Sequence, residues 1–364
     1  MSNIPNFEQW AKMNDYLNSI AVSLGSEVDV STWAGVQKAV RLGLAPDLFP
    51  IGSQLKVNHK VYGEQLYEVV AHDYLKSERD KNTHTMTIMS HNVIAGVQFD
   101  SPEAFYYAEN DLPAGTYNFT YNGRIYQFTL PRTLPKGGQL CFNDGTSSSP
   151  ESHTVKVYAN QFSTTATDEV AITVGSQGSN LGVIDSIERV LYGSNNYKES
   201  AIRQFLNSSA TAGNVWTPQT KYDRPPTWVS SLTGFAGGFD DDFLSVVGEV
   251  VVPCSANNIY ESPDSTTATG EKYSVTDKFY LASQREIFGS DYNTVADDSV
   301  MLPYYEGVLS VDRIKYRDSS TAGWWLRSAH IKLAHAGQIV TSVGNLSSEA
   351  VANGYGCVPM CTIV

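Results

Sequence analysis

The carboxyl-terminal part of the chain constrains the fold more than any other stretch of the sequence. Residues 355–364, YGCVPMCTIV, form an apolar, strand-like run without a polar tail. Order is normally lost at a chain end, so this run predicts a strand held in a core. Residues 323–329, GWWLRSA, predict a second strand. The residues between these two predicted strands have no clear hydrophobic period. A regular framework around an irregular segment is typical of a rigid scaffold that presents a variable surface.

Length, composition and charge narrow the class of protein. The chain has 364 residues, enough for two or three domains with a sizeable core. Only 17% of the residues are charged, and Tyr, Ser, Thr, Asn and Gly are abundant, which favours a β-rich extracellular or virion protein. The net charge of −13 argues against a nucleic-acid partner and against docking on an anionic membrane.

The sequence has neither a secretory signal pattern nor an apolar run long enough to span a membrane. A role at a cell surface would therefore require release by lysis or assembly into a particle. The N-terminal segment, residues 1–48, contains one amphipathic helical pattern over 6–24 and a second that begins at Ser31 and ends at Gly43. We expect these helices to pack together, trimerise or dock on a partner; packing against the next domain is the alternative.

Chemistry-bearing residues are sparse and scattered. The seven histidines show no metal-ligand spacing, and we predict neither a metal site nor a cofactor. Residues 240–242 are three consecutive aspartates, which cap a helix or contribute to a structural calcium site. Nucleophile-elbow and phosphate-loop motifs are absent, whereas a carboxylate pair for glycoside cleavage stays open because its separation is spatial. We predict that the protein is not an enzyme. The cysteines are interpreted as buried free thiols: Cys141, Cys254, Cys357 and Cys361.

The pattern in the middle of the chain predicts strands separated by turns. Alternation predicts strands at 54–57, 65–71 and 85–89. Residues 111–178 are interpreted as an inserted small β-sandwich or barrel of about five short strands, with a hairpin turn at Asn122-Gly123. After residue 180 the helical period returns, and further strands are expected at 279–283, 313–316, 324–328 and 337–340.

Several motifs of the second half occur together in one known family. They are the runs 196–207, 279–289 and 324–328, followed by Gly356-x-x-Pro359. In this combination the chain resembles the C-type-lectin-like domains of phage and gut-bacterial proteins, and it is similar to the variable proteins of diversity-generating retroelements. Residues 223–226 and 238–244 look like the phage members. The resemblance covers 50–108 and 180–364. The chain lacks the arginine of the family's usual Gly-Val-Arg-Pro-Ala ending, so Arg327 needs a different partner.

The resemblance implies an α+β fold. Residues 49–110 and 179–364 would form a split C-type-lectin-like domain, with residues 111–178 as the inserted all-β domain and residues 1–48 as a helical anchoring and oligomerisation segment. The scaffold residues would be Trp324, Trp325, Arg327 and Pro359. Adjacent strand residues point to opposite faces, so one tryptophan is expected in the core and the other as a platform for displayed residues.

The function implied is adhesion. The protein would be a phage-encoded virion component, a tail-tip or fibre adhesin made in the bacterial cytoplasm, that binds a glycan or protein receptor on the host cell. The N-terminal helices would attach it to other virion proteins as a homo-oligomer, for example a trimer. Two alternatives stay open: a formylglycine-generating-type or glycan-hydrolysing enzyme, and a capsid decoration or head-fibre protein.

The displayed segment would run from His330 to Tyr355, and its diversification at the gene level is a hypothesis. The residues expected to face outward are His330, Lys332, His335, Gln338, Thr341, Asn345, Ser347 and Asn353. Tyrosine offers rigid apolar area with a polar tip, so Tyr304, Tyr305 and Tyr355 are candidates for the binding rim; ordinary sheet tyrosines are the alternative.

Overall fold

The computed structural model describes residues 28–76, 83–121, 124–142, 154–174, 180–183, 187–257 and 270–364. The helix expected at 6–24 and the turn expected at Asn122-Gly123 lie outside the described residues. Strands account for 38% and helices for 15% of the structure. The expectation of an α+β, C-type-lectin-like fold is therefore wrong. The described chain is mostly β, built from several small sheets that are largely antiparallel and form no closed barrel.

The described helices are short, and the longest has nine residues. Within the stripe at 184–191, interpreted as a helix, the described residues form α4 (Ile187–Tyr192). The expected helix after Ser31 is confirmed as α2 (Trp33–Arg41), whose first turn is capped by the Thr32 hydroxyl. The other helical elements are α3 (Ala45–Leu48), α5 (Ala201–Asn207), α6 (Asp241–Val246), α7 (Gln284–Phe288), η2 (Ala236–Gly238), η3 (Pro303–Tyr305) and η4 (Ser310–Arg313).

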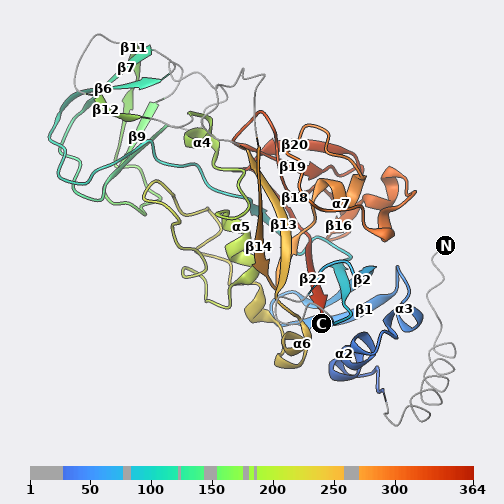
Figure 1. Cartoon of the computed structure of the whole chain (residues 1–364). Coiled ribbons are helices and arrows are strands. Elements are labelled where there is room, and N and C mark those ends of the chain that lie inside the picture. The colour runs from blue at the N-terminus through green and yellow to red at the C-terminus, as the bar shows by residue number, and fades with distance from the viewer. Residues whose placement is uncertain are drawn as a thin grey trace.

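The first of two five-stranded sheets is antiparallel, in the order β1-β2-β3-β22-β15. Its strands are β1 (Gln54–His59), β2 (Gly63–His72), β3 (Met86–Ser90), β22 (Pro359–Ile363) and β15 (Phe279–Leu281). Every residue of β22 is buried. The prediction that the last apolar run forms a strand in a core is confirmed, and Figure 1 shows β22 within the body of the molecule.

The second five-stranded sheet has the order β20-β19-β18-β21-β4. Its strands are β20 (Leu346–Ala350), β19 (Ala336–Val340), β18 (Trp324–Ala329), β21 (Gly354–Cys357) and β4 (Ala95–Gln98). The pair β18–β21 is parallel and the other pairs are antiparallel. Trp324 and Trp325 are both fully buried because both faces of β18 are covered. The expectation that only one of the two tryptophans lies in the core is therefore wrong.

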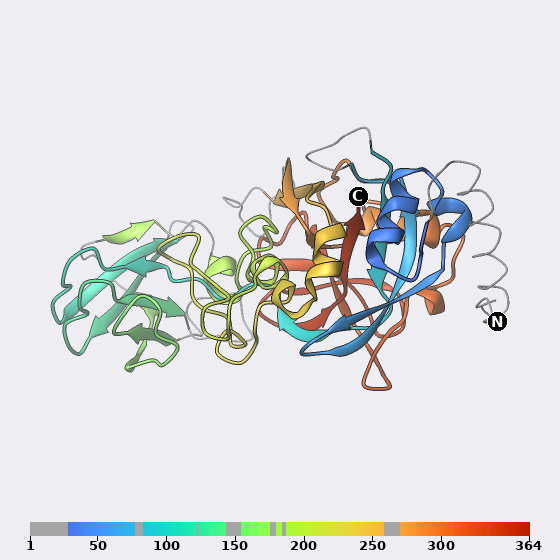
Figure 2. The same ribbon diagram turned by 90° about the horizontal axis from the view of Figure 1, so that it is seen from below.

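Residues from Phe105 to Leu191 build a second hydrophobic core, separate from the core shared by the five-stranded sheets. It lies between two four-stranded sheets, β10-β9-β8-β5 and β11-β7-β6-β12. The strands are β5 (Tyr106–Tyr107), β6 (Gly115–Tyr121), β7 (Arg124–Leu130), β8 (Gln139–Phe142), β9 (Thr154–Tyr158), β10 (Asp168–Ala171), β11 (Thr173–Val174) and β12 (Asn180–Val183). Figure 2 shows these strands at one end of an elongated molecule. The division into domains stays a prediction.

Two hairpin-like pairs complete the described structure. They are β13 (Val250–Asn257) with β14 (Gly270–Asp277), and β16 (Lys315–Arg317) with β17 (Ser320–Ala322). The strand β13 packs beside β18. The Tyr316 carbonyl on β16 accepts from the Val93 N–H, just before β4. Figure 1 shows β13 and β14 beside β18.

Candidate functional site

A buried ion pair locks the centre of the framework. The side chains of Arg327 and Glu286 are both fully buried, and the guanidinium Nη1 and Nη2 donate to Glu286 Oε2 and Oε1 at 2.6 and 2.7 Å. Arg327 also donates to the Pro253 and Leu281 carbonyls at 2.8 and 2.6 Å. Glu286 is positioned by the capping box that it forms with Ser283 at the start of α7. Glu286 is thus the partner that the sequence left open for Arg327.

A second buried network surrounds Glu68 on β2. Its carboxylate accepts from Lys315 Nζ at 3.1 Å, His91 Nδ1 at 2.8 Å and the Tyr304 hydroxyl at 3.0 Å. Burial opposes ionisation of Glu68, but the His91 hydrogen bond and the Lys315 charge outweigh it and lower the pKa to about 2. Tyr304 is thereby held against β2. Tyr305 is fully buried, with its hydroxyl 3.4 Å from Met89 Sδ, so it does not face outward as expected.

The segment predicted to be displayed is only partly at the surface. Lys332, Asn345 and Asn353 are exposed. Four more of the predicted residues are half-buried: His335, Thr341, Ser347 and Tyr355. We call these seven residues the rim. They lie in the loop before β19, in the turn after it, on the edge strand β20, and at or beside the start of β21.

His330 and Gln338, also expected to face outward, are buried. The His330 Nδ1 accepts from the N–H groups of Lys332 and Leu333 at 3.1 and 3.2 Å, which shapes the loop. The Gln338 amide donates to the Asn293 carbonyl at 2.8 Å. Gln338 is buried because β19 lies between β18 and β20 and all its residues are buried. His330 directly follows the buried strand β18 and pairs with Thr294 in an isolated bridge.

The rim is anchored to the core at two points. The Tyr355 ring packs edge-on against Trp325, with centroids 5.3 Å apart, so the buried tryptophan supports a half-exposed tyrosine from within. The His335 ring lies 4.8 Å from the Tyr192 ring at the end of α4. Between these points, Asn353 Nδ2 donates to Glu349 Oε2 at 3.2 Å, which ties the turn after β20 back to that strand.

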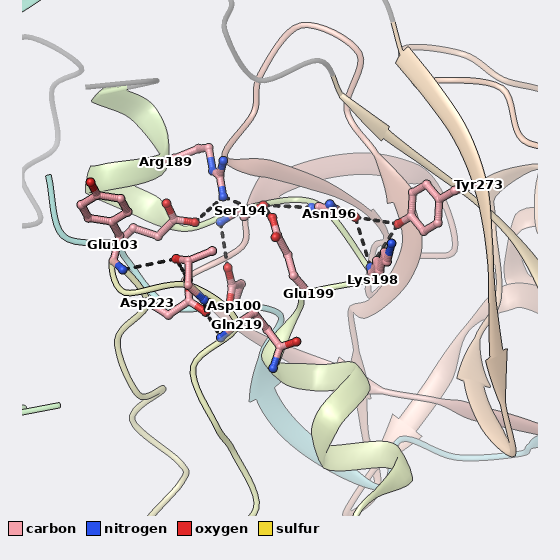
Figure 3. Close-up of polar contacts among 12 residues, drawn as sticks. Asp100, Glu103, Arg189, Ser194, Asn196, Lys198, Glu199, Gln219, Asp223 and Tyr273 are labelled. Carbon is pink, nitrogen blue, oxygen red and sulfur yellow. Dashed lines mark hydrogen bonds and ion pairs between the residues drawn. The ribbon is translucent and has the colours of Figure 1, made fainter. Parts of the chain in front are cut away.

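A polar network joins the two cores (Figure 3). Arg189 on α4 pairs with Glu103 at 2.6 Å and Glu199 at 3.2 Å. Ser194 donates its N–H to Asp100 Oδ2 at 2.9 Å and its hydroxyl to Glu199 at 3.1 Å. Burial raises the pKa of Glu103 to about 7 against the opposing Arg189 charge, and burial together with the Glu103 charge raises the pKa of Asp100 well above its usual range. The arrangement is that of a structural ion-pair network.

The same network reaches β14. The Tyr273 hydroxyl donates to Asn196 Oδ1 at 2.7 Å and accepts from the Lys198 N–H at 3.0 Å, as Figure 3 shows. Asn196 Oδ1 also accepts from the Lys198 N–H at 3.1 Å. These bonds set the entry into α5, whose first turn is capped by the Ser200 hydroxyl.

A pocket of about 420 Å³ opens beside this network, between strands β8 and β9 and the loop 224–230. Its lining residues are Ser101, Pro102, Cys141, Phe142, Lys156, Tyr158, Thr164, Arg224, Pro225, Pro226, Thr227, Val229 and Ser230. We call it the seam pocket. No role for this pocket follows from the sequence, although residues 223–226, at its edge, resemble those of phage proteins. No local signal could place that loop against β8 and β9, which are far away in the chain.

The geometry offers little support for metal or thiol chemistry. In the part of the chain that the structure describes, no group of three or more His, Cys, Asp or Glu side chains is arranged to hold a metal ion. The prediction of buried free cysteines is confirmed for all four. Burial raises the pKa of Cys141 to about 11 and that of Cys254 to about 12, so these thiols stay protonated and are poor nucleophiles. Asp240 lies at the N-cap of α6 without a capping hydrogen bond.

Among the described helices, none is long and apolar enough to cross a membrane. Comparison with known families gives one match. A family model described as "Domain of unknown function (DUF6273)" matches residues 179–364, just over half of the 364-residue chain. The chain belongs to the DUF6273 family. The matched region holds the rim, the Arg327–Glu286 pair and the Arg224 side of the seam pocket, whereas β8 and β9 precede it. No curated protein and no solved structure matches the chain.

Proposed function

We propose that this protein is a phage virion component, a tail-tip or fibre adhesin, that binds a host-cell receptor through the rim. The observation that carries the proposal is the separation of the rim from the framework. Lys332, Asn345 and Asn353 are exposed on loops and turns, while the adjacent strands β18 and β19 are buried throughout. Substitutions at such rim positions change the surface without altering the core.

The chemistry of the rim suits a recognition surface. It combines adaptable polar side chains with Tyr355, a rigid aromatic residue supported by Trp325. A few anchors of this kind carry most of the binding energy in protein interfaces. The rim residue Ser347 lies on β20, which is an edge strand of its sheet.

The attribution to a phage particle is supported by the sequence resemblance of the motifs that frame the rim. Those frames, residues 324–328 and 356–359, lie inside the DUF6273 region. Attachment to other virion proteins through the N-terminal segment is part of the same proposal, and it is supported by the amphipathic pattern over 6–24.

The test is competition for adsorption. Purified full-length protein is added to cells of the bacterium in which the encoding phage multiplies, and both protein binding and phage adsorption are measured. We expect saturable binding and a matching loss of adsorption. The triple variant Lys332→Ala, Asn345→Ala, Asn353→Ala should bind at least about tenfold more weakly, because truncation of interface contacts removes binding energy without unfolding the protein.

A matched control keeps the charge change but moves it off the rim. Lys60→Ala alters an exposed lysine whose ammonium lies 3.5 Å from Asp240, near the start of α6. This variant should bind as the wild type does. Wild-type protein that neither binds the cells nor blocks adsorption would exclude an adhesin, and unchanged binding by the triple variant would exclude the rim as the binding surface.

A further inference from the structure

Three lysine or arginine side chains are buried in the described chain, and one of them differs from the others. Arg327 is paired with Glu286 and Lys315 with Glu68. Arg224, at 7% exposure, donates to Gln139 Oε1 at 2.8 Å and to the Ser163 carbonyl, which are both uncharged. No described carboxylate lies within ion-pair distance of Arg224. A buried cation without an anionic partner is costly, so the guanidinium of Arg224 is a position where an anion would be bound favourably.

The surroundings hold Arg224 in place without neutralising it. Its guanidinium carbon lies 3.3 Å from the centre of the Tyr158 ring, so one face is stacked on β9. Gln139 fixes the loop by donating to the Lys221 carbonyl at 2.9 Å while its oxygen accepts from Arg224. A guanidinium has five N–H donors, and the hydrogen bonds of Arg224 to Gln139, Ser163 and the Cys141 sulfur account for three of them. The group is therefore preorganised with donors to spare.

The charge of the seam pocket is opposite to that of the protein. Among its described lining residues, Lys156 and Arg224 are basic and none is acidic, in a chain whose net charge is −13. Lys156 faces one carboxylate, Glu169, at the long distance of 3.9 Å, and that carboxylate is 54% exposed. Such a pair contributes little, so the Lys156 ammonium can turn to a ligand. Glu103, behind the pocket, is already paired with Arg189.

The remaining lining suits a small hydroxylated ring. Hydroxyl groups come from Ser101, Thr164, Thr227 and Ser230, and apolar walls come from three prolines and Val229. Phe142 and Tyr158 add aromatic side chains to the lining. A volume of about 420 Å³ lies at the lower end of the range for ligand pockets. Cations, hydroxyls and a nearby aromatic face together match a carboxylated sugar.

We propose that the seam pocket binds an acidic sugar residue of a glycan, with its carboxylate held by Arg224 and Lys156. The fork of Arg224 matches a carboxylate in two-point geometry, and Lys156 on β9 adds a second positive charge to the lining. This site is separate from the rim, and the proposal does not depend on the adhesin function of the rim.

The test is calorimetric or saturation-transfer NMR titration of the full-length protein with free sugars. Glucuronic acid is the probe, glucose is the matched neutral ring, and acetate is the carboxylate without a ring. We expect glucuronic acid to bind at least about tenfold more tightly than either, since it alone engages both the cations and the hydroxyl-lined walls. Raising the salt concentration should weaken binding through screening.

Substitutions of the two basic lining residues test whether glucuronic acid binds in the seam pocket. Lys156→Gln, at a side chain that is 27% exposed, should keep the fold and weaken glucuronic acid binding about fivefold. Arg224→Gln should abolish binding, and its thermal unfolding shows whether the pocket is intact. Lys60→Gln, which removes a lysine charge remote from the pocket, and the rim variant Lys332→Ala should both bind as the wild type does.

Other outcomes overturn the proposal. If glucose binds as tightly as glucuronic acid, the pocket does not recognise the carboxylate. If acetate binds as tightly as glucuronic acid, the pocket does not recognise the sugar ring. Absence of glucuronic acid binding, or binding that survives Lys156→Gln unchanged, would remove the acidic-sugar site. None of these measurements uses cells. The acidic-sugar site can therefore be confirmed or excluded independently of the adhesin proposal.

Discussion

At the scale of single residues, the distribution of buried charges separates framework from site. Arg327 and Lys315 each meet a carboxylate in the core, and each pair also bonds to backbone or side-chain oxygens nearby. Arg224 is also buried but bonds to the neutral acceptors of Gln139 and Ser163. A buried ion pair such as Arg327–Glu286 is strongly destabilised when one partner is removed. Arg224 is not in an ion pair with any described residue, so its charge is available to bind an anion.

The Arg327–Glu286 pair gives a prediction of stability. Glu286→Gln leaves the Arg327 charge buried without a counter-charge, and we expect it to lower the free energy of unfolding by about 3 kcal/mol or more. Chemical denaturation monitored by tryptophan fluorescence measures the change. The matched control is Glu64→Gln, whose partner Lys56 is 68% exposed, and it should cost less than about 1 kcal/mol. Equal losses for the two variants would contradict the role of burial.

Glu68 gives a prediction of pH dependence. Its pKa is lowered from 4.5 to about 2 in the folded protein. A carboxyl group with a depressed folded pKa adds stability that is complete above its unfolded pKa and is lost as the pH falls toward the folded one. The stability advantage of wild type over Glu68→Gln should therefore shrink by about 3 kcal/mol between about pH 5 and pH 2. Parallel stability profiles for the two proteins across this range would rule the prediction out.

At the scale of elements, the turn that follows β19 is set by close backbone contact. Gly344 has a φ of +80°, and a Cβ atom there would lie 1.7 Å from the Ser310 carbonyl oxygen at the start of η4. The turn itself is closed by Thr341, which accepts from the Gly344 N–H at 2.9 Å through its carbonyl and donates its own N–H to the Asn345 carbonyl at 2.8 Å. The rim residues Thr341 and Asn345 are thus positioned by the contact with η4.

The glycine contact predicts a difference between two otherwise similar substitutions. Gly307 has a φ of +70° with no atom within 4 Å of a Cβ, so Gly307→Ala should cost only the left-handed strain of about 1–2 kcal/mol. Gly344→Ala adds a clash with backbone, and we expect a loss clearly larger than that of Gly307→Ala, together with displacement of the turn. Thermal unfolding of the two variants gives the comparison. Equal losses would mean that the turn moves freely off η4.

At the scale of the whole molecule, two hydrophobic cores are joined by a polar seam. The core of the five-stranded sheets and the core of residues 105–191 share no members, and Arg189 connects them through Glu103 and Glu199. Figure 2 shows how far the strands of the smaller core project from the body. The seam pocket lies at this junction, where ligand sites are common.

The seam predicts a local loss of protection on mutation. Arg189→Gln should accelerate amide hydrogen exchange in β8 and β9 while β18 and β22 stay protected, because the smaller core loses its tether. The matched control is Arg203→Gln, which breaks the ion pair with Asp277 at 2.8 Å within the larger core. It should accelerate exchange in β14 and leave β8 and β9 unchanged. Mass spectrometry of the exchanged peptides distinguishes the patterns, and identical patterns would contradict a two-core molecule.

Sequence alone determined the local features of this protein. The strands at 54–57, 65–71 and 85–89, the helix α2 and the buried β22 were predictable because each depends on neighbouring residues and short apolar patterns. The exposure of Lys332, Asn345 and Asn353 was expected from the family resemblance and not from local patterns.

Only the tertiary structure decided which side chains are covered and which charges meet. Trp325, His330 and Gln338 are buried because distant strands surround them, and no nearby residue signals that. Lys315 pairs with Glu68 across 247 positions, and Arg224 reaches Gln139 across 85. Burial and ion pairing depend on segments brought together by folding, whereas turns and strand alternation depend on covalent neighbours. The α+β prediction was wrong for the same reason. The family motifs are short local segments, and they do not show which sheets those segments form in the folded chain.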